Sequence, residues 1–271
     1  MTQMFPAGKI QLPWQAPRIA VLELHGTIGM QVRGAEMVRT IKALTDDARI
    51  RAVVIDIDSP GGSAPVSDAI YRAVRKLSAR KPTIAFVMNG ALSGGYLIAS
   101  AARKIVALPT SLVGSIGVIF MRPVVQELMD KVGVQMVMTY EGKLKGMFQP
   151  WREPTPEEQE KVQALTDEYY TWFVEAVAKA REMPVETVRR YATGESFSAR
   201  QGKEIGLVDE LGDLDTALDM ASELSKTPRR LQYVRPRRPM LERLMARGGA
   251  SVAASIMAAV DERLYARIEY R

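Results

Sequence analysis

Hydrophobic and polar positions over the first 140 residues alternate between two periods. Short β-branched or apolar runs predict strands, and the stretches between them carry apolar residues three or four positions apart, which predicts helices. Turn residues such as Gly, Pro and Asn separate several of these segments. The expected strands cover 18–24, 51–58, 82–90, 104–108, 114–120 and 134–140, and the expected helices cover 33–46, 64–79 and 123–132, with one more beginning near Ser93.

This alternation indicates an α/β fold built from stacked ββα or βαβ units around a buried, largely parallel sheet. From Thr155 onward the pattern becomes helical. A helix over 155–182 has Thr155 as its N-cap, with Glu157 and Glu158 in its first turn. Further helices are expected at 184–192, at 213–225 and from residue 239.

The composition of the 271 residues, 47% apolar and 25% charged, is that of a globular protein with a sizeable core. The chain has no cysteine, which excludes disulfides, thiolate zinc sites and cysteine nucleophiles. It has no run of 18 apolar residues, and its first residues lack the basic start and apolar centre of a signal peptide. We therefore expect a cytoplasmic or peripheral membrane protein.

The net charge of +6 is unevenly distributed, with an arginine-rich segment near the C-terminus. Such a segment favours contact with anionic lipid, or it is a solvated linker. It has no interleaved aromatic residues and no helix-turn-helix pattern, so we expect no nucleic acid partner. Its arginines are Arg229, Arg230, Arg235, Arg237, Arg238, Arg243 and Arg247.

The stretch LSGGYLIAS (92–100) follows an expected strand that ends at Asn-Gly. A strand, a turn that bears serine and glycines, and then a helix resemble in logic the turns that present nucleophiles in hydrolases. Free amides at the helix N-terminus favour a developing oxyanion. Ser93 is therefore our candidate nucleophile, although serine is also a favoured helix N-cap.

A second glycine turn, DSPGGS (58–63), follows another expected buried strand. Paired glycines allow backbone amides to face a ligand, although the same turn can simply join a strand to a helix. Adjacent parallel strands end at the same edge of a sheet, so we expect both glycine turns to border one crevice.

A serine nucleophile needs a base, and the chain has a single histidine, His25. His25 follows the first expected strand, where a structural role is the alternative. A lysine amine is the other option, because burial lowers the pKa of a lysine and makes it a competent base.

Five blocks carry the remaining motifs: DSPGGS (58–63), SGGYLIAS (93–100), VGSIGV (113–118), EGKLKGMFQPWREPTPEE (141–158) and GESFSARQGKEIGLVDELG (194–212). In their order, and over about residues 18–220, they resemble the signal peptide peptidase A family, serine peptidase family S49. The resemblance implies a ClpP/crotonase-like fold of stacked ββα units with C-terminal helices. It also implies a serine endopeptidase that cleaves remnant signal peptides or unfolded or membrane-protein segments.

By this resemblance, Ser93 is the nucleophile and Lys145 the base of a Ser-Lys dyad. Lys143 is a reserve base, because it lies only two residues from Lys145. Ser115 matches the serine that hydrogen-bonds the lysine amine. The oxyanion and substrate-binding positions are matched by Gly61, Gly62 and Gly94.

Four features differ from the family or carry no catalytic assignment. Arg152 matches the Pro-x-Arg element, to which we assign a structural part. Gly146 stands where an acidic residue often follows the lysine, and Gly202 stands where alanine is usual. The sequence shows no segment like the family's usual N-terminal membrane anchor. We therefore expect peptidase chemistry and leave the cleavage of signal peptides in the membrane open.

We divide the chain into an N-terminal extension (1–17), a peptidase domain (18–225) and a basic, partly helical tail (226–271). The chain has one family-type catalytic core. Its resemblance to family members with a single core implies a ring of subunits. We therefore expect a homo-oligomer, an octamer being one such form, with the dyad shared between neighbouring subunits. Peptides are the expected substrates, and no metal, nucleotide or flavin motif suggests a cofactor.

Two other functions stay open at this point. A crotonase-fold enzyme would use the same oxyanion turns on an acyl-CoA thioester, but neither turn has a glutamate placed as a base. A peptidase-like scaffold would only bind peptides or membrane proteins, without catalysis.

Overall fold

The computed structural model describes residues 16–236. The expected helix from residue 239 and the arginines beyond residue 236 lie outside these residues, as does most of the N-terminal extension. Within the described part of the chain, no helix is both long enough and apolar enough to cross a membrane.

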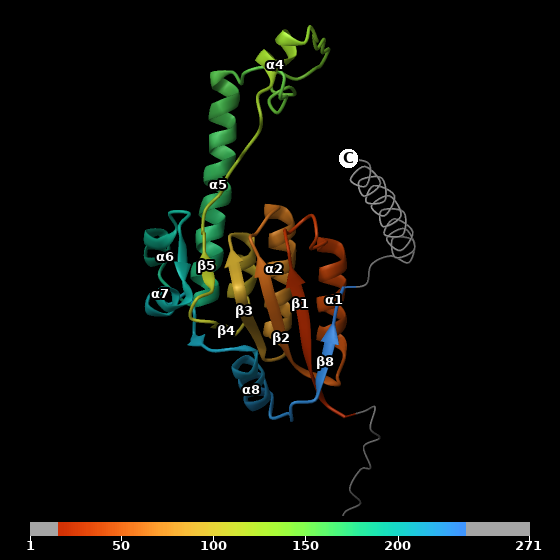
Figure 1. The fold of residues 1–271 in the computed structure, drawn as a ribbon, viewed down its shortest axis with the longest axis vertical. Helices are drawn as coiled ribbons and strands as arrows, with labels where there is room; N and C mark the ends of the chain where they lie inside the picture. The colour runs from red at the N-terminus through yellow and green to blue at the C-terminus, as the bar shows by residue number, and fades with distance from the viewer. Residues whose placement is uncertain (1–15, 237–271) are drawn as a thin grey trace, which may run out of the picture. The chain divides into compact units, whose positions relative to one another are not determined.

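An eight-stranded, mostly parallel sheet forms the centre of the described fold (Figure 1). The strand order is β6-β5-β3-β2-β1-β8, with β4 paired to β3 and β7 paired to β4. Only the pairing of β5 with β6 is antiparallel among the described strands. The bounds are β1 (Arg18–His25), β2 (Ile50–Ser59), β3 (Thr83–Leu92), β4 (Lys104–Ala107), β5 (Leu112–Gly114), β6 (Ser196–Ser198), β7 (Glu210–Leu211) and β8 (Leu231–Val234).

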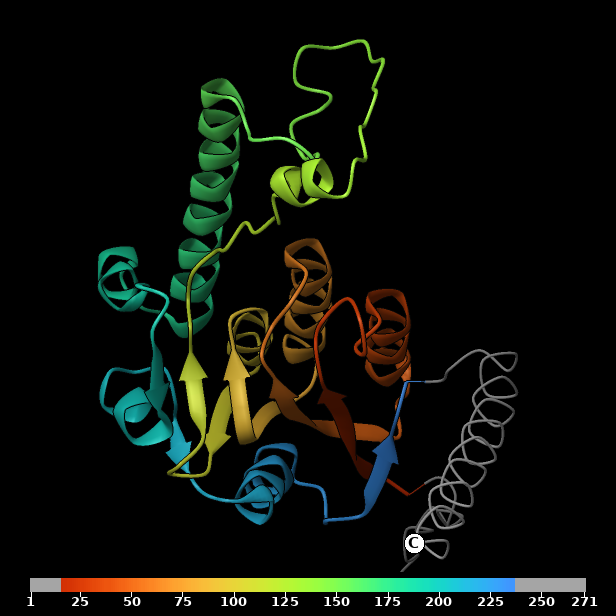
Figure 2. The same ribbon diagram turned by 45° about the horizontal axis from the view of Figure 1, so that its top comes forward.

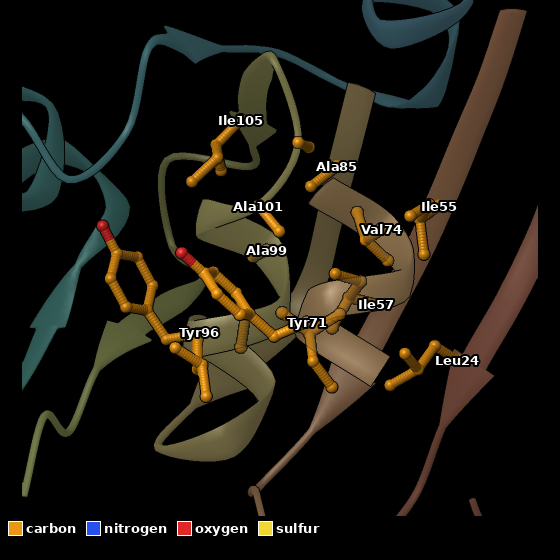
Figure 3. Close-up of a cluster of buried hydrophobic side chains, with 14 of the residues drawn as sticks. Leu24, Ile55, Ile57, Tyr71, Val74, Ala85, Tyr96, Ala99, Ala101 and Ile105 are labelled. Atoms are coloured by element: carbon orange, nitrogen blue, oxygen red, sulfur yellow. The ribbon is translucent and has the colours of Figure 1, made fainter. Parts of the chain in front are cut away.

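Side chains alternate between the two faces of the sheet, and each face is covered by its own helices (Figure 2). One face packs against α1 (Gly34–Asp46), α2 (Ala64–Ser78) and α3 (Gly94–Ser100), and Figure 3 shows part of this core. The opposite face packs against α8 (Leu214–Ser225). The remaining helices are α4 (Gln126–Lys131), α5 (Pro156–Arg181), α6 (Val185–Tyr191) and α7 (Ala199–Glu204).

The α/β fold and the early strand–helix alternation are confirmed, but three expected strands differ. The strand expected at 82–90 continues to Leu92, and the strand expected at 114–120 contributes only Gly114 to β5. The strand expected at 134–140 is wrong, because this segment pairs with no other strand in the described structure. Its apolar side chains are largely exposed, Val137 by 91%, so the alternating pattern there does not record burial in a sheet.

Strand β8 follows α8 in the chain and pairs with β1 in parallel, at one end of the strand order. The expected end of the peptidase domain at residue 225 falls before this strand. The sheet therefore includes four residues, Leu231–Val234, that the sequence analysis placed in the C-terminal tail.

Helix α5 is anchored at one end only. Its N-terminus has the expected Thr155 cap, completed by Glu158 as a reciprocal capping box. Its C-terminal half contributes Phe173, Val174 and Val177 to the core, whereas no residue from 159 to 172 is buried. Figures 1 and 2 show that its N-terminal half projects away from the sheet together with the segment that joins β5 to α5.

A buried ion pair joins the C-terminal end of α5 to the segment 206–209, which also contacts α3. Arg181, with only 8% of its side chain exposed, donates to Asp209 at 2.7 Å and to the Gly206 carbonyl. Burial alone would raise the pKa of Asp209, but the hydrogen bonds from Arg181 bring that pKa below its usual value. The neighbouring Leu207 carbonyl accepts the hydroxyl of Tyr96 in α3 at 2.9 Å.

Asp209→Asn should therefore lower the free energy of unfolding by about 3–5 kcal/mol, because it leaves the Arg181 charge buried without a carboxylate. Urea unfolding followed by tryptophan fluorescence measures this loss. The matched control is Glu210→Gln, which removes the exposed pair with Lys203 and should cost at most about 1 kcal/mol. Equal losses in the two variants would show that the buried pair stabilises the fold no more than the exposed pair does.

Candidate active site

Ser93 lies between the carboxyl end of β3 and the first residue of α3, in a rarely populated backbone conformation. Its φ is 50° and its ψ is −121°, a region that non-glycine residues seldom adopt. Its N–H donates to the Gly114 carbonyl at 2.9 Å, and its carbonyl accepts from Leu97 at 3.0 Å. Strain of this kind is common where a side chain is presented to a substrate.

The Ser93 hydroxyl does not cap α3, although Ser93 occupies the N-cap position. Within residues 16–236, it makes no hydrogen bond to any group. The alternative of a simple capping serine is therefore not supported, and the hydroxyl is available to react.

The two glycine turns lie directly against each other, as expected from the parallel strands that precede them. A Cβ on Gly61 would lie 2.7 Å from the Ser93 Cβ and 3.0 Å from the Gly94 nitrogen. A Cβ on Gly62, whose φ is +146°, would lie 2.1 Å from the Ile28 carbonyl oxygen. Only glycine permits the contact of Gly61 with the serine turn and that of Gly62 with the Ile28 backbone.

The backbone amides of these turns are not equivalent. The Gly61 N–H donates to the buried Ser59 hydroxyl at 3.2 Å, and that hydroxyl in turn donates to the Gly26 carbonyl at 2.7 Å. The N–H groups of Gly62 and Gly94 have no acceptor in the described part of the chain. Ser59 was missed as a site residue, although it stands in the DSPGGS block.

Ser115 lies beside the same turn, because it follows Gly114, the residue that accepts the Ser93 N–H. Its own N–H donates to the Glu195 carbonyl at 2.8 Å, and its φ is 51°. Two strained serines, Ser93 and Ser115, therefore lie next to each other at the carboxyl ends of β3 and β5.

Lys145 is not brought to Ser93 within one chain. It lies in the segment between β5 and α5, which both Figure 1 and Figure 2 show at the outer end of α5, away from the sheet. No hydrogen bond or ion pair joins residues 140–152 to either glycine turn in the described structure. A single chain thus presents the serine and the lysine in different places.

The structure distinguishes the two lysines of this segment. The Lys143 amine lies 2.6 Å from a Glu157 carboxylate oxygen, so this side chain already has an ion-pair partner. The exposed Lys145 side chain makes no hydrogen bond or ion pair with any residue in 16–236.

His25 lies on the other face of the sheet from α3. It shares a face with Ile19 and Val21, which pack against α8, and its Nε2 lies 3.0 Å from Asp56 Oδ2. Burial raises the pKa of Asp56 despite the opposing attraction of His25. This pair supports the structural role for His25 and leaves Ser93 without a histidine base.

A mostly parallel sheet with helices on both faces, and a serine turn packed against a glycine turn, define a ClpP/crotonase-like protein. Residues 20–114 match the family described as Clp protease, and residues 75–227 match Peptidase family S49. The chain therefore belongs to peptidase family S49, a family of serine peptidases.

Several known proteins are similar to this chain. The Synechocystis sp. protein slr0021 is 36% identical over 208 residues, which cover 77% of this chain and 74% of that one. "Serine protease SPPA, chloroplastic" of Arabidopsis thaliana is 31% identical over 222 residues, covering 78% of this chain and 33% of that protein. "Protease 4" of Salmonella typhi is 31% identical over 240 residues, covering 88% and 37%. The chain thus spans only about a third of the last two.

The fold also matches a solved structure, that of a mutant of the "1510-N membrane-bound stomatin-specific protease". The TM-score is 0.54, and the match covers 82% of this chain and 99% of that one. At 15% sequence identity, this likeness shows the shared fold alone.

Gly62→Ala should lower the rate at which a fluorophosphonate acylates Ser93 by about 100-fold or more, because the added Cβ displaces a turn whose amide is a free donor in the described structure. Gly90→Ala is the matched control, since a Cβ there would meet its nearest atom at 3.8 Å, an ordinary contact. Intact-protein mass spectrometry over time measures both rates. An acylation rate of Gly62→Ala close to that of Gly90→Ala would contradict the assignment of the Gly62 turn to the oxyanion site.

Proposed function

We propose that this protein is a serine endopeptidase in which Ser93 and Lys145 form a Ser-Lys dyad. The observation that carries the proposal is the Ser93 hydroxyl, which within residues 16–236 is free and lies in a strained turn beside two amides without acceptors. The resemblance to the signal peptide peptidase A family supplies the assignment of Lys145.

In the proposed reaction, the neutral Lys145 amine takes the proton of the Ser93 hydroxyl, and the Ser93 oxygen attacks the peptide carbonyl carbon. The Gly62 and Gly94 amides donate to the resulting oxyanion. Protonated Lys145 then gives its proton to the leaving amine, and the acyl-enzyme forms. Water attacks this ester by the same route and releases the free acid.

The position of Ser115 suits the expected contact with the lysine amine, because Ser115 lies beside Ser93. Gly61 has a supporting part in this scheme. Its N–H is already bonded to Ser59, so it shapes the turn that exposes the Gly62 amide. The departure at Gly202 has a packing reason, since a Cβ there would lie 2.7 Å from a Val113 methyl group.

A lysine exposed to water is almost fully protonated at pH 7, whereas a base has to be neutral. Lys145 therefore has to be covered when it works, and a neighbouring copy of the chain would supply both the cover and Ser93. The projecting segment suits such a contact, because it exposes many apolar side chains in a single chain. These are Ile119, Phe120, Met121, Val124, Leu128, Val132, Val134, Met136, Val137, Tyr140 and Phe148.

We further infer that the active form is a homo-oligomer in which Ser93 of one subunit meets Lys145 of the next. A contact of this head-to-tail kind closes into a ring when the rotation between subunits is suitable. The octamer is the ring that the family resemblance suggests.

The proposed substrates are extended peptides with apolar or small residues, such as remnant signal peptides and unfolded or membrane-protein segments. Glycine-flanked strand ends leave backbone groups open to an added strand. The names of similar proteins, a chloroplastic serine protease among them, are consistent with peptide substrates.

Ser93→Ala and Lys145→Ala should each lower turnover of a fluorogenic peptide by several orders of magnitude, because each removes one half of the dyad. Lys143→Ala is the control for the same segment and should keep most of the activity, since that amine is paired with Glu157. Loss of activity in Lys143→Ala, with retention in Lys145→Ala, would reverse the assignment of the base.

Co-expression of Ser93→Ala and Lys145→Ala chains in equal amounts tests the shared site. Random assembly places an intact serine beside an intact lysine at about one quarter of the contacts, so about 25% of wild-type turnover should return. If each chain used its own lysine, the mixture would remain as inactive as its parents.

A further inference from the structure

We propose that Arg152, held by the buried carboxylate of Glu158, is a positioning residue for Lys145. The inference rests on the proposed function, in which Lys145 is the base. It goes beyond the sequence analysis, which gave Arg152 a structural part only.

Glu158 is an unusual residue for the end of a projecting helix, because it is charged and only 2% exposed. Its two carboxylate oxygens accept from both terminal nitrogens of Arg152, at 2.5 and 2.8 Å. It also accepts the Thr155 N–H at 3.0 Å, as part of the capping box of α5. Arg152 is thereby fixed to the first turn of a helix.

The pair stays charged over the working range of a peptidase. The hydrogen bonds from Arg152, together with that from the Thr155 N–H, lower the pKa of Glu158 to about 2. A lowered carboxyl pKa means that this stabilisation is present above the ordinary pKa and is lost only as the pH falls towards 2. Neutral pH therefore leaves the contact intact.

The same guanidinium group reaches the lysine segment. Arg152 Nη2 donates to the Gly146 carbonyl at 3.0 Å, and Gly146 is the residue directly after Lys145. A Cβ on Gly146 would lie 3.2 Å from that nitrogen, closer than most side chains allow. The close approach of Arg152 leaves little space beside Gly146 on this side of the segment.

A second arginine holds the next carbonyl group. Arg122 Nη1 donates to the Met147 carbonyl at 2.6 Å, and its other terminal nitrogen reaches the Arg152 carbonyl at 3.4 Å. The Lys145 N–H closes the turn by donating to the Gly142 carbonyl at 2.9 Å. The backbone on both sides of Lys145 is thus fixed, while its side chain is left to meet a serine.

Such support matters because a base has to lie within hydrogen-bond reach of the hydroxyl it deprotonates. A displacement of about 1 Å can cost about 100-fold in rate. The nearby Lys143–Glu157 pair offers no comparable support, because it joins two exposed side chains and holds no backbone carbonyl in the described structure.

The test compares Arg152→Lys and Glu158→Gln with Glu157→Gln, a matched control in the same helical turn. The first two should lower kcat by about 10- to 100-fold with little change in KM, and the control should stay within about 2-fold of wild type. The pH profile of Ser93 acylation by a fluorophosphonate gives a second readout. Its rising limb should move to higher pH in Arg152→Lys, because a displaced lysine is less covered and has a higher pKa.

A double-variant comparison separates this inference from the proposed function. In a Lys145→Ala background, Arg152→Lys should lower the remaining acylation rate no further, because the residue it positions is absent. An equal loss in both backgrounds would overturn the inference. The inference would also be overturned if both Arg152→Lys and Glu158→Gln sedimented as smaller species than wild type, because Arg152 would then support assembly of the oligomer instead. Wild-type turnover in Lys145→Ala would instead contradict the proposed Ser-Lys dyad.

Discussion

The contact between the Gly61–Gly62 turn and Ser93 is the constraint on which the rest of the site depends. It requires a residue without a Cβ atom at Gly61 and a serine with a positive φ at Ser93, both at the carboxyl ends of neighbouring parallel strands. Gly62 lies against the Ile28 backbone instead. The Gly61 N–H donates to Ser59, whereas the Gly62 and Gly94 N–H groups have no acceptor within the described residues. Local backbone strain thereby accompanies one available hydroxyl and two N–H groups that can receive an oxyanion.

The second constraint is the length and direction of α5. One end of this helix is held in the core by Phe173, Val174 and the Arg181–Asp209 pair. The other end carries the lysine segment away from its own serine (Figure 1). A helix anchored at one end in this way presents the attached segment to another molecule, which is why the proposed function calls for a second copy of the chain.

Arginine–carboxylate pairs secure both ends of this arrangement. Arg181 and Asp209 join α5 to the region behind α3, and Arg152 and Glu158 join the start of α5 to the lysine segment. In each pair the carboxyl pKa is lowered, so both contacts persist at neutral pH. In each pair the arginine also donates to a backbone carbonyl, which turns a charge pair into a support for the chain.

Sequence alone was sufficient for the α/β class, most of the regular elements and the family, because these follow from local periodicity and from short motifs. It also nominated Ser93 as the nucleophile, and that role stays a prediction. It did not exclude a strand at 134–140, since alternation of side chains says nothing about whether a neighbouring strand is present. It also could not show that Ser59 engages the Gly61 amide, that His25 turns to Asp56, or that Arg152 holds Gly146. Those facts depend on directions and distances that the folded chain alone decides, even where the partners are near in sequence.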